Sequence, residues 1–279
     1  LALPDTNTKL HPVTTKAGVA YAFNDGLVAL GPAWVEGRLA VLANVGMLVQ
    51  PTTRAQYLAK SVPVPTNLFS HSDQVLAMQT GDPNGSGGTG WAGRSADAVI
   101  SMNGAANFPA AFSTSGAAIF CAGSVIQAAS LYPGFTLGLN GLGNWQQSIA
   151  GANAKALGEI LAVDLGASLA QAANKVRKDA IDLNKMLMSA GSSSGLTTQF
   201  PGTTLGQQLQ QIAQIISLRN QTGIKRQVFF CSLGGFDTHS TQSWNYWDLL
   251  RQVGDAMFAF YTATKEMGIA DKVTTFTES

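Results

Sequence analysis

The stretch Gln227-Val-Phe-Phe-Cys-Ser-Leu233 and the Gly234-Gly-Phe-Asp-Thr-His239 that follows it decide the fold class. The apolar run has the length of a strand, and the two glycines after it let the chain turn closely. Apolar residues recur every three or four positions over 205–216 and over 247–261, which predicts a helix on each side of the run. Strands that alternate with helices predict an α/β domain with a mainly parallel sheet flanked by helices.

Four further apolar runs are expected to form strands. Gly37–Gly46 is closed by glycine at both ends, as is typical of a strand buried on both faces. Ala117–Ala122 and Phe135–Leu139 lie among Gly, Pro and Asn residues, so they fit short strands, some of them at a sheet edge. Val273–Thr277 has the pattern of a buried strand.

Helices and loops are expected between these strands. Asn24-Asp25 is placed to cap a helix through Leu27, Leu30 and Trp34, which kinks or breaks at Pro32. A serine at the start of Phe69–Gln79 caps a second predicted helix. Gly81–Gly90 is a loop by composition, and it lacks the Gly-Lys-Ser/Thr ending of a phosphate-binding P-loop. The stretch of about 144–222 is expected to be a mainly helical insertion or cover.

The composition excludes several classes of protein. The chain has 279 residues, of which 46% are apolar, enough for a substantial core in one large domain or two small ones. Charged residues make up only 12% and the net charge is +1, so an electrostatic nucleic-acid binder is not expected. The longest nearly apolar stretch, Leu39–Val49, contains Asn44 and falls short of the ~20 residues that span a bilayer, so no membrane span is expected.

Two cysteines and one of the three histidines are assigned structural roles. Cys121 and Cys231 lie in apolar runs and are expected to be buried thiols, although a disulfide between them is left open. His11 is expected in a loop without an acidic or thiol neighbour.

Asp237 and His239 are candidates for half of a divalent-metal site. A buried strand delivers them just past its carboxyl end, where ligands bind in open α/β sheets. Residues at i and i+2 can point the same way, and carboxylate and imidazole both bind divalent metals. The alternative is that Asp237 caps the following helix while His239 hydrogen-bonds nearby. The spacing alone leaves both open.

Ser70 and His71 are the second set of candidates. A hydroxyl at a helix start lies where unpaired backbone N–H groups favour a phosphate or sulfate group, and a metal-activated serine can attack such a group. The alternative is ordinary N-capping by Ser70 or Ser72, which the sequence favours. We expect the stretches around 70 and 237–239 to converge on one crevice.

Several of these motifs occur in an order that resembles a known family. They are Leu10-His-Pro, Gly37-Arg-Leu-Ala-Val, Phe69-Ser-His-Ser-Asp-Gln74, Thr89-Gly-Trp-Ala-Gly-Arg94, Gly235-Phe-Asp-Thr-His239 and Thr274-Thr-Phe-Thr277. Together they resemble the bacterial domain-of-unknown-function 1501 family, which is related to the alkaline phosphatase and sulfatase superfamily. Its members commonly carry a twin-arginine export signal.

The resemblance implies a single alkaline-phosphatase-like domain over 1–279 and hydrolysis of phosphate or sulfate esters. It places Asp237 and His239 as ligands of a divalent ion (zinc, calcium, manganese or magnesium), Ser70 as the nucleophile and His71 in the same site. It further implies a small-molecule or glycan ester substrate and a periplasmic or extracellular location. The alternative is an exported carbohydrate- or protein-binding module that kept the fold and lost turnover.

The family pattern extends beyond both ends of this sequence. Its Gly-Gly-x-Asp-Gly motif precedes Leu1, and its Phe-Gly-Arg motif and Asp-His pair follow Ser279. The domain is therefore expected to be incomplete, and residues 1–279 alone are expected to be poorly active.

Overall fold

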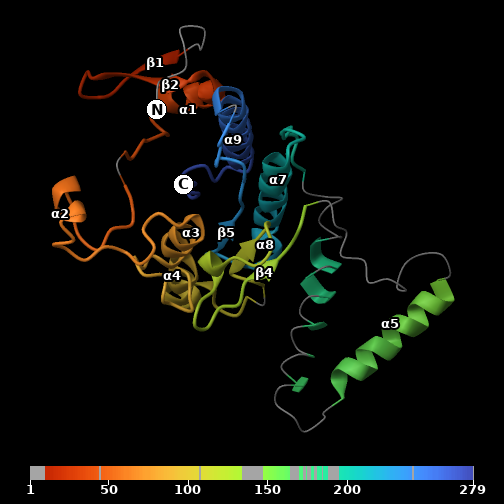
Figure 1. The fold of residues 1–279 in the computed structure, drawn as a ribbon. Coiled ribbons are helices and arrows are strands. Elements are labelled where there is room, and N and C mark those ends of the chain that lie inside the picture. Colours follow the sequence, from red (N-terminus) through yellow and green to blue (C-terminus); the bar gives the residue numbers. More distant parts are fainter. Residues whose placement is uncertain are drawn as a thin grey trace.

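The computed structural model describes most of the chain. The described residues are 10–43, 45–106, 108–133, 147–163, 170–171, 174, 177–178, 181–183, 185–187, 195–240 and 242–278. They form an α/β arrangement in which a small parallel sheet lies among helices, as Figure 1 shows.

The sheet has the strand order β4-β3-β5, and all its pairs are parallel. Its strands are β3 (Ala111–Ser113), β4 (Ala129–Ser130) and β5 (Val228–Phe230). Phe112 pairs with Phe229, and their rings stack with centroids 5.8 Å apart. The predicted strand within 227–233 and the parallel sheet are confirmed, although β5 is shorter than the apolar run.

Helices cover both faces of the sheet. The helices beside it are α3 (His71–Thr80), α4 (Trp91–Val99), η2 (Ile100–Asn103), η3 (Ile119–Cys121), α7 (Thr204–Ser217), α8 (Arg219–Thr222) and α9 (Gln242–Glu266). On one face Ala111, Val228 and Phe230 pack with Ala92 and Ala96 of α4. On the other face Phe112 and Phe229 pack with Ile215 of α7.

Helices α7 and α9 pack against each other, and the apolar periodicity predicts the buried face of α7 but not that of α9. Leu209, Ile212 and Ile216 of α7 are buried with Ala256 and Phe260 of α9 in one cluster. The two helices predicted on either side of the strand are confirmed.

The amino-terminal part forms a hairpin followed by two helical segments. These elements are β1 (Leu10–Thr14), β2 (Ala20–Asn24), η1 (Asp25–Leu30) and α1 (Gly31–Val35), and β1 pairs antiparallel with β2. Asn24 caps the helical stretch by accepting from Gly26 N, and the helix changes from 3-10 to α just before Pro32, so the cap and the break are confirmed. His11 was wrongly placed in a loop without an acidic neighbour. It lies in β1 with Nε2 2.6 Å from Asp25 Oδ1.

Three predicted strands are wrong. Gly37–Gly46 forms no strand at its described residues, and Val41 and Leu42 are 61% and 85% exposed. Val273–Thr277 forms no strand either, and Phe276 stacks on Trp91. Ala117–Ala122 turns into η3, whose end lets Ala122 O accept from Gly90 N. Apolar character favours burial, whereas a strand also needs a neighbouring backbone to pair with.

The helical stretch of about 144–222 contains elements of two kinds. Helix α5 (Gln147–Ala162) lies apart from the rest of the molecule in Figure 1, whereas α7 belongs to the core. The described residues among 170–187 are helical. The predicted strand Phe135–Leu139 lies outside the described residues.

Both cysteines are free thiols. Cys121 is buried and Cys231 is half-buried, and burial raises the pKa of Cys121 to about 12 and that of Cys231 to about 11. A pKa this high keeps the thiols protonated and unreactive at neutral pH. The expectation of a buried thiol is confirmed for Cys121.

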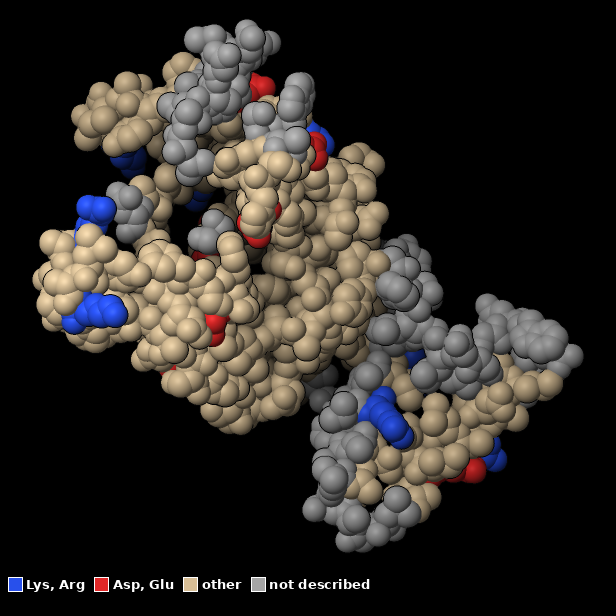
Figure 2. All heavy atoms as spheres, viewed as in Figure 1, with Lys and Arg blue, Asp and Glu red and all other residues tan. Residues whose placement is uncertain are grey.

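The surface is weakly charged, as the composition predicts. On the face in Figure 2, Lys, Arg, Asp and Glu are scattered among uncharged side chains. Among the described residues no helix is both long and apolar enough to cross a membrane.

Helix α4 lies close to the backbone that follows η3, and Gly93 is the residue of α4 at this contact. A Cβ at this position would overlap the backbone of Ala122 and Gly123. We expect Gly93→Ala to lower the free energy of unfolding by about 1–3 kcal/mol in urea titrations. Gly158→Ala in α5 is the control, because no atom lies within 4 Å of its added Cβ. Equal stability of Gly93→Ala and the wild type would contradict this packing.

Glu266 ties the segment before α7 to the end of α9. Its carboxylate accepts bonds from the backbone N–H and hydroxyl groups of Thr197 and Thr198, which lower its pKa to about 2. This stabilising contribution is complete above pH 4.5, the ordinary pKa of the group, and is lost as the pH falls through about 2. We therefore expect the Thr197 and Thr198 amide proton shifts to titrate near pH 2 in NMR spectra and not to titrate in Glu266→Gln. A midpoint near 4.5 would show that the bonds are absent.

Candidate functional site

Three predicted site residues lie together around one carboxylate. His239 Nδ1 is 3.1 Å from Asp237 Oδ1, and His71 Nε2 is 3.9 Å from Asp237 Oδ2. We call these residues the His71–Asp237–His239 cluster. The two stretches around 70 and 237–239 therefore lie close together, as predicted, but these three side chains are exposed instead of enclosed in the predicted crevice.

The cluster lies at the surface. The side chains of His71 and His239 are each 81% exposed, and that of Asp237 is 56% exposed. Water screens ion pairs at such exposure, so these contacts add little to stability. Because neighbouring groups do not fix the three side chains, they can turn toward a ligand.

The start of α3 places Ser70 and His71. Ser70 is the N-cap residue, and its Oγ accepts from Asp73 N at 3.4 Å and lies 3.2 Å from Ser72 Oγ. His71 is the first residue of the helix. The capping alternative for Ser70 is thus observed, although its hydrogen bond is long and therefore weak.

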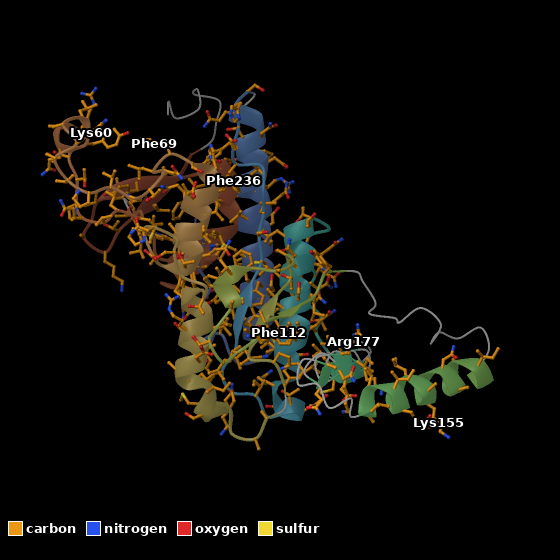
Figure 3. The ribbon with its side chains drawn as sticks, turned by 60° about the horizontal axis from the view of Figure 1, so that its bottom comes forward. Lys60, Phe69, Phe112, Lys155, Arg177 and Phe236 are labelled. Carbon is orange, nitrogen blue, oxygen red and sulfur yellow. The ribbon has the colours of Figure 1, made fainter. Side chains whose placement is uncertain are left out.

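The loop after β5 places Asp237 and His239. Gly235 has a φ of 98°, which L-residues with a side chain rarely adopt, and lets the chain turn after the strand. Phe236 then packs edge-on against Tyr246 of α9. Figure 3 shows Phe236 and Phe69 toward the same end of the molecule, with Phe112 of the core below them.

The helix-capping alternative is observed for Ser70 but not for Asp237. Its carboxylate contacts His71 and His239, and α9 begins only at Gln242. His239 contacts Asp237 itself, with Nδ1 and Oδ1 3.1 Å apart, but it makes no hydrogen bond among the described residues.

Gln208 is a positioning residue that the sequence analysis missed. Its buried amide donates to Ser232 O at 3.0 Å and accepts from Ser232 N at 3.0 Å, so it pairs with the backbone just after β5 ends. Ser115 Oγ also donates to Gln208 Oε1, at 2.6 Å. The available signal was a glutamine next to Leu209, on the face of α7 that the apolar periodicity predicts to be buried.

The donor types in the cluster fit a divalent ion, but their arrangement does not yet enclose one. Two imidazoles and one carboxylate are ligands that zinc takes in catalytic sites. Among the described residues, however, no three such side chains are placed to hold a metal ion. The histidines contact Asp237 directly, so the exposed side chains must separate for an ion to enter.

Gln208→Ala tests whether the amide fixes the strand end. The change removes both hydrogen bonds to Ser232, each worth about 0.5–1.5 kcal/mol. We expect faster hydrogen exchange at the Ser232 amide than in Gln207→Ala, whose side chain is exposed on the same helix. Unchanged exchange at Ser232 would show that Gln208 does not restrain the loop.

Comparisons of the chain with protein-family models, with curated proteins and with solved structures find no match.

Proposed function

We propose that this protein is a metal-dependent hydrolase of phosphate or sulfate esters, with an alkaline-phosphatase-like fold, in the family that its motifs resemble. The observation that carries the proposal is the 3.9 Å approach of His71 to Asp237. It joins the helix start bearing Ser70 to the loop bearing two candidate metal ligands. A parallel sheet between helices is compatible with this fold.

His71, Asp237 and His239 would hold the ion. When bound, a divalent ion favours the deprotonated form of a nearby hydroxyl and offsets the negative charge that develops on a transferred phosphoryl or sulfuryl group. The 81% exposure of the two histidines leaves them free to move apart and admit the ion.

Ser70 supplies the attacking oxygen in this mechanism. Its Oγ forms a bond to the phosphorus or sulfur atom, and the bond from that atom to the ester oxygen breaks. The hydroxyl proton of Ser70 leaves to water, and the departing alcohol takes up a proton from water. Water then cleaves the serine ester and regenerates Ser70.

The first turn of α3 supports the anion during the reaction. Unpaired N–H groups at a helix start favour negative charge. The bond from Asp73 N to Ser70 Oγ is 3.4 Å long, so attack by Ser70 gives up little capping energy.

A non-catalytic carbohydrate- or protein-binding module is the second candidate. Two observations favour it: Ser70 acts as a helix cap, and no described set of three side chains is placed around an ion. A metal-replete protein that binds a ligand saturably but turns over no ester would support this candidate over the first. In either case we propose a periplasmic or extracellular location, on the family resemblance, with a small-molecule or glycan ester as the substrate of the hydrolase.

The metal is tested by titrating the protein at its full natural length with zinc, calcium, manganese or magnesium in a calorimeter. We expect Asp237→Ala and His239→Ala to weaken binding at least about tenfold, since each removes a ligand. His11→Ala is the control, because His11 pairs with Asp25 outside the cluster. Normal binding by both cluster variants would remove these residues from the metal site.

The nucleophile is tested in the same protein with aryl phosphate and aryl sulfate. Ser70→Asn keeps a side chain that caps helices well but has no hydroxyl, so we expect loss of turnover with metal binding retained. Ser72→Ala removes the neighbouring hydroxyl, 3.2 Å from Ser70 Oγ, and is expected to keep turnover. Equal turnover by Ser70→Asn and the wild type would exclude Ser70 as the nucleophile.

A further inference from the structure

An open hollow of about 540 Å³ adjoins Ser70 and has no role in the mechanism above. The segment 57–69 and the first turn of α3 line it, with Tyr57, Pro65 and Phe69 as apolar members and Asn67, Ser70 and Asp73 as polar ones. Its size lies within the ~300–1,000 Å³ of small-molecule sites. It is therefore large enough for a ligand group attached to an ester at Ser70.

Two aromatic rings form the apolar part of the hollow. Phe69 is 77% exposed, although large apolar side chains are usually buried. Tyr57 of α2 (Arg54–Leu58) meets it edge to face, with ring centroids 5.7 Å apart and an interplanar angle of 89°. This contact steadies the exposed ring and leaves it as a flat apolar platform.

The backbone around the platform is restrained before a ligand arrives. Pro63 and Pro65 fix their own φ angles in the segment that leads to the hollow. Asn67 has a φ of 54°, and its carbonyl accepts from Ser70 N at 2.8 Å, which closes a turn around Phe69. A preformed hollow loses less entropy on binding than a mobile one.

The polar side chains that line the hollow determine which charge a bound ligand can carry there. None of the described residues that line the hollow carries a positive charge, and Asp73 contributes a carboxylate. Within the described part of the chain, no hydrogen bond reaches the side chains of Asp73 and Asn67. The part of a ligand that lies in the hollow is therefore uncharged, presents hydroxyl donors to these side chains and has one apolar face for Phe69.

We propose that the hollow is a subsite for a pyranose ring, so that the substrate is a sugar ester. The C–H groups on one face of a pyranose carry slight positive charge and suit the negative face of an aromatic ring. Its hydroxyl groups suit Asn67 and Asp73, and the ester group on the same sugar would reach Ser70. This inference rests on the proposed function for the ester, but the binding of the ring stands independently.

The subsite is tested by titrating the full-length protein with neutral methyl pyranosides in calorimetry and ligand-observed NMR. We expect saturable binding in the millimolar range to at least one of them, weakened about tenfold or more in Phe69→Ala and restored in Phe69→Trp. Phe69→Leu keeps an apolar side chain without a ring face and is expected to behave as Phe69→Ala. Leu58→Ala is the matched control, because Leu58 is exposed on α2 but does not line the hollow. Thermal unfolding checks that each variant is folded.

The outcomes separate the subsite from the hydrolase. Pyranoside binding that depends on Phe69 without any ester turnover supports the subsite and contradicts the hydrolase. Turnover with an equal effect of Phe69→Ala on kcat/KM for sugar sulfates and simple aryl sulfates contradicts the subsite alone. Absence of pyranoside binding, or tighter binding of phenol than of every pyranoside, also overturns the proposal.

Discussion

The parallel pairing of β3 with β5 is the constraint on which the rest of the structure depends. It joins chain segments far apart in sequence and sends alternate side chains to opposite faces. Phe112 and Phe229 face α7, whereas Ala111, Val228 and Phe230 face α4. Helices therefore cover both faces, which is why β5 is apolar throughout and β3 carries a single polar residue, the buried Ser113.

Two buried amides extend the restraint beyond this short strand. Before β5, Asn103 accepts from Lys225 N and Arg226 N and donates to Arg226 O. After β5, Gln208 makes the same kind of paired contact with Ser232. Buried polar groups stay only where their hydrogen bonds are satisfied, so the amides fix both ends of the strand in a single register. The loop that carries Asp237 and His239 thus starts from a rigid point.

Sequence patterns predicted the helices that bury an apolar stripe. They failed for strands whose formation depends on pairing with another strand. The spacing of Leu209, Ile212 and Ile216 defines one face of a helix by itself, so α7 was predictable. The run Gly37–Gly46 is just as apolar, but its described residues have no neighbouring strand and lie exposed. Strand formation depends on distant backbone, which a local pattern does not contain. The position of Asp237 just past a strand was predictable from the apolar run 227–233, whereas no strand precedes His71, so its contact with Asp237 does not follow from strand-end positions. Gln208 was hidden because a single polar residue in an apolar stripe gives no indication of its partner.

The exposure of the cluster determines what else a hydrolase at this site needs. Charges in contact with water interact weakly, and neither the 3.1 Å nor the 3.9 Å contact holds its histidine in one orientation. A metal ion would supply the missing restraint, because coordination fixes the ligands relative to one another. Even so, the three exposed side chains of the cluster make few contacts that could discriminate between different esters. Discrimination must then come from groups next to Ser70 that are already fixed in place, and the ring pair of Tyr57 and Phe69 meets that requirement.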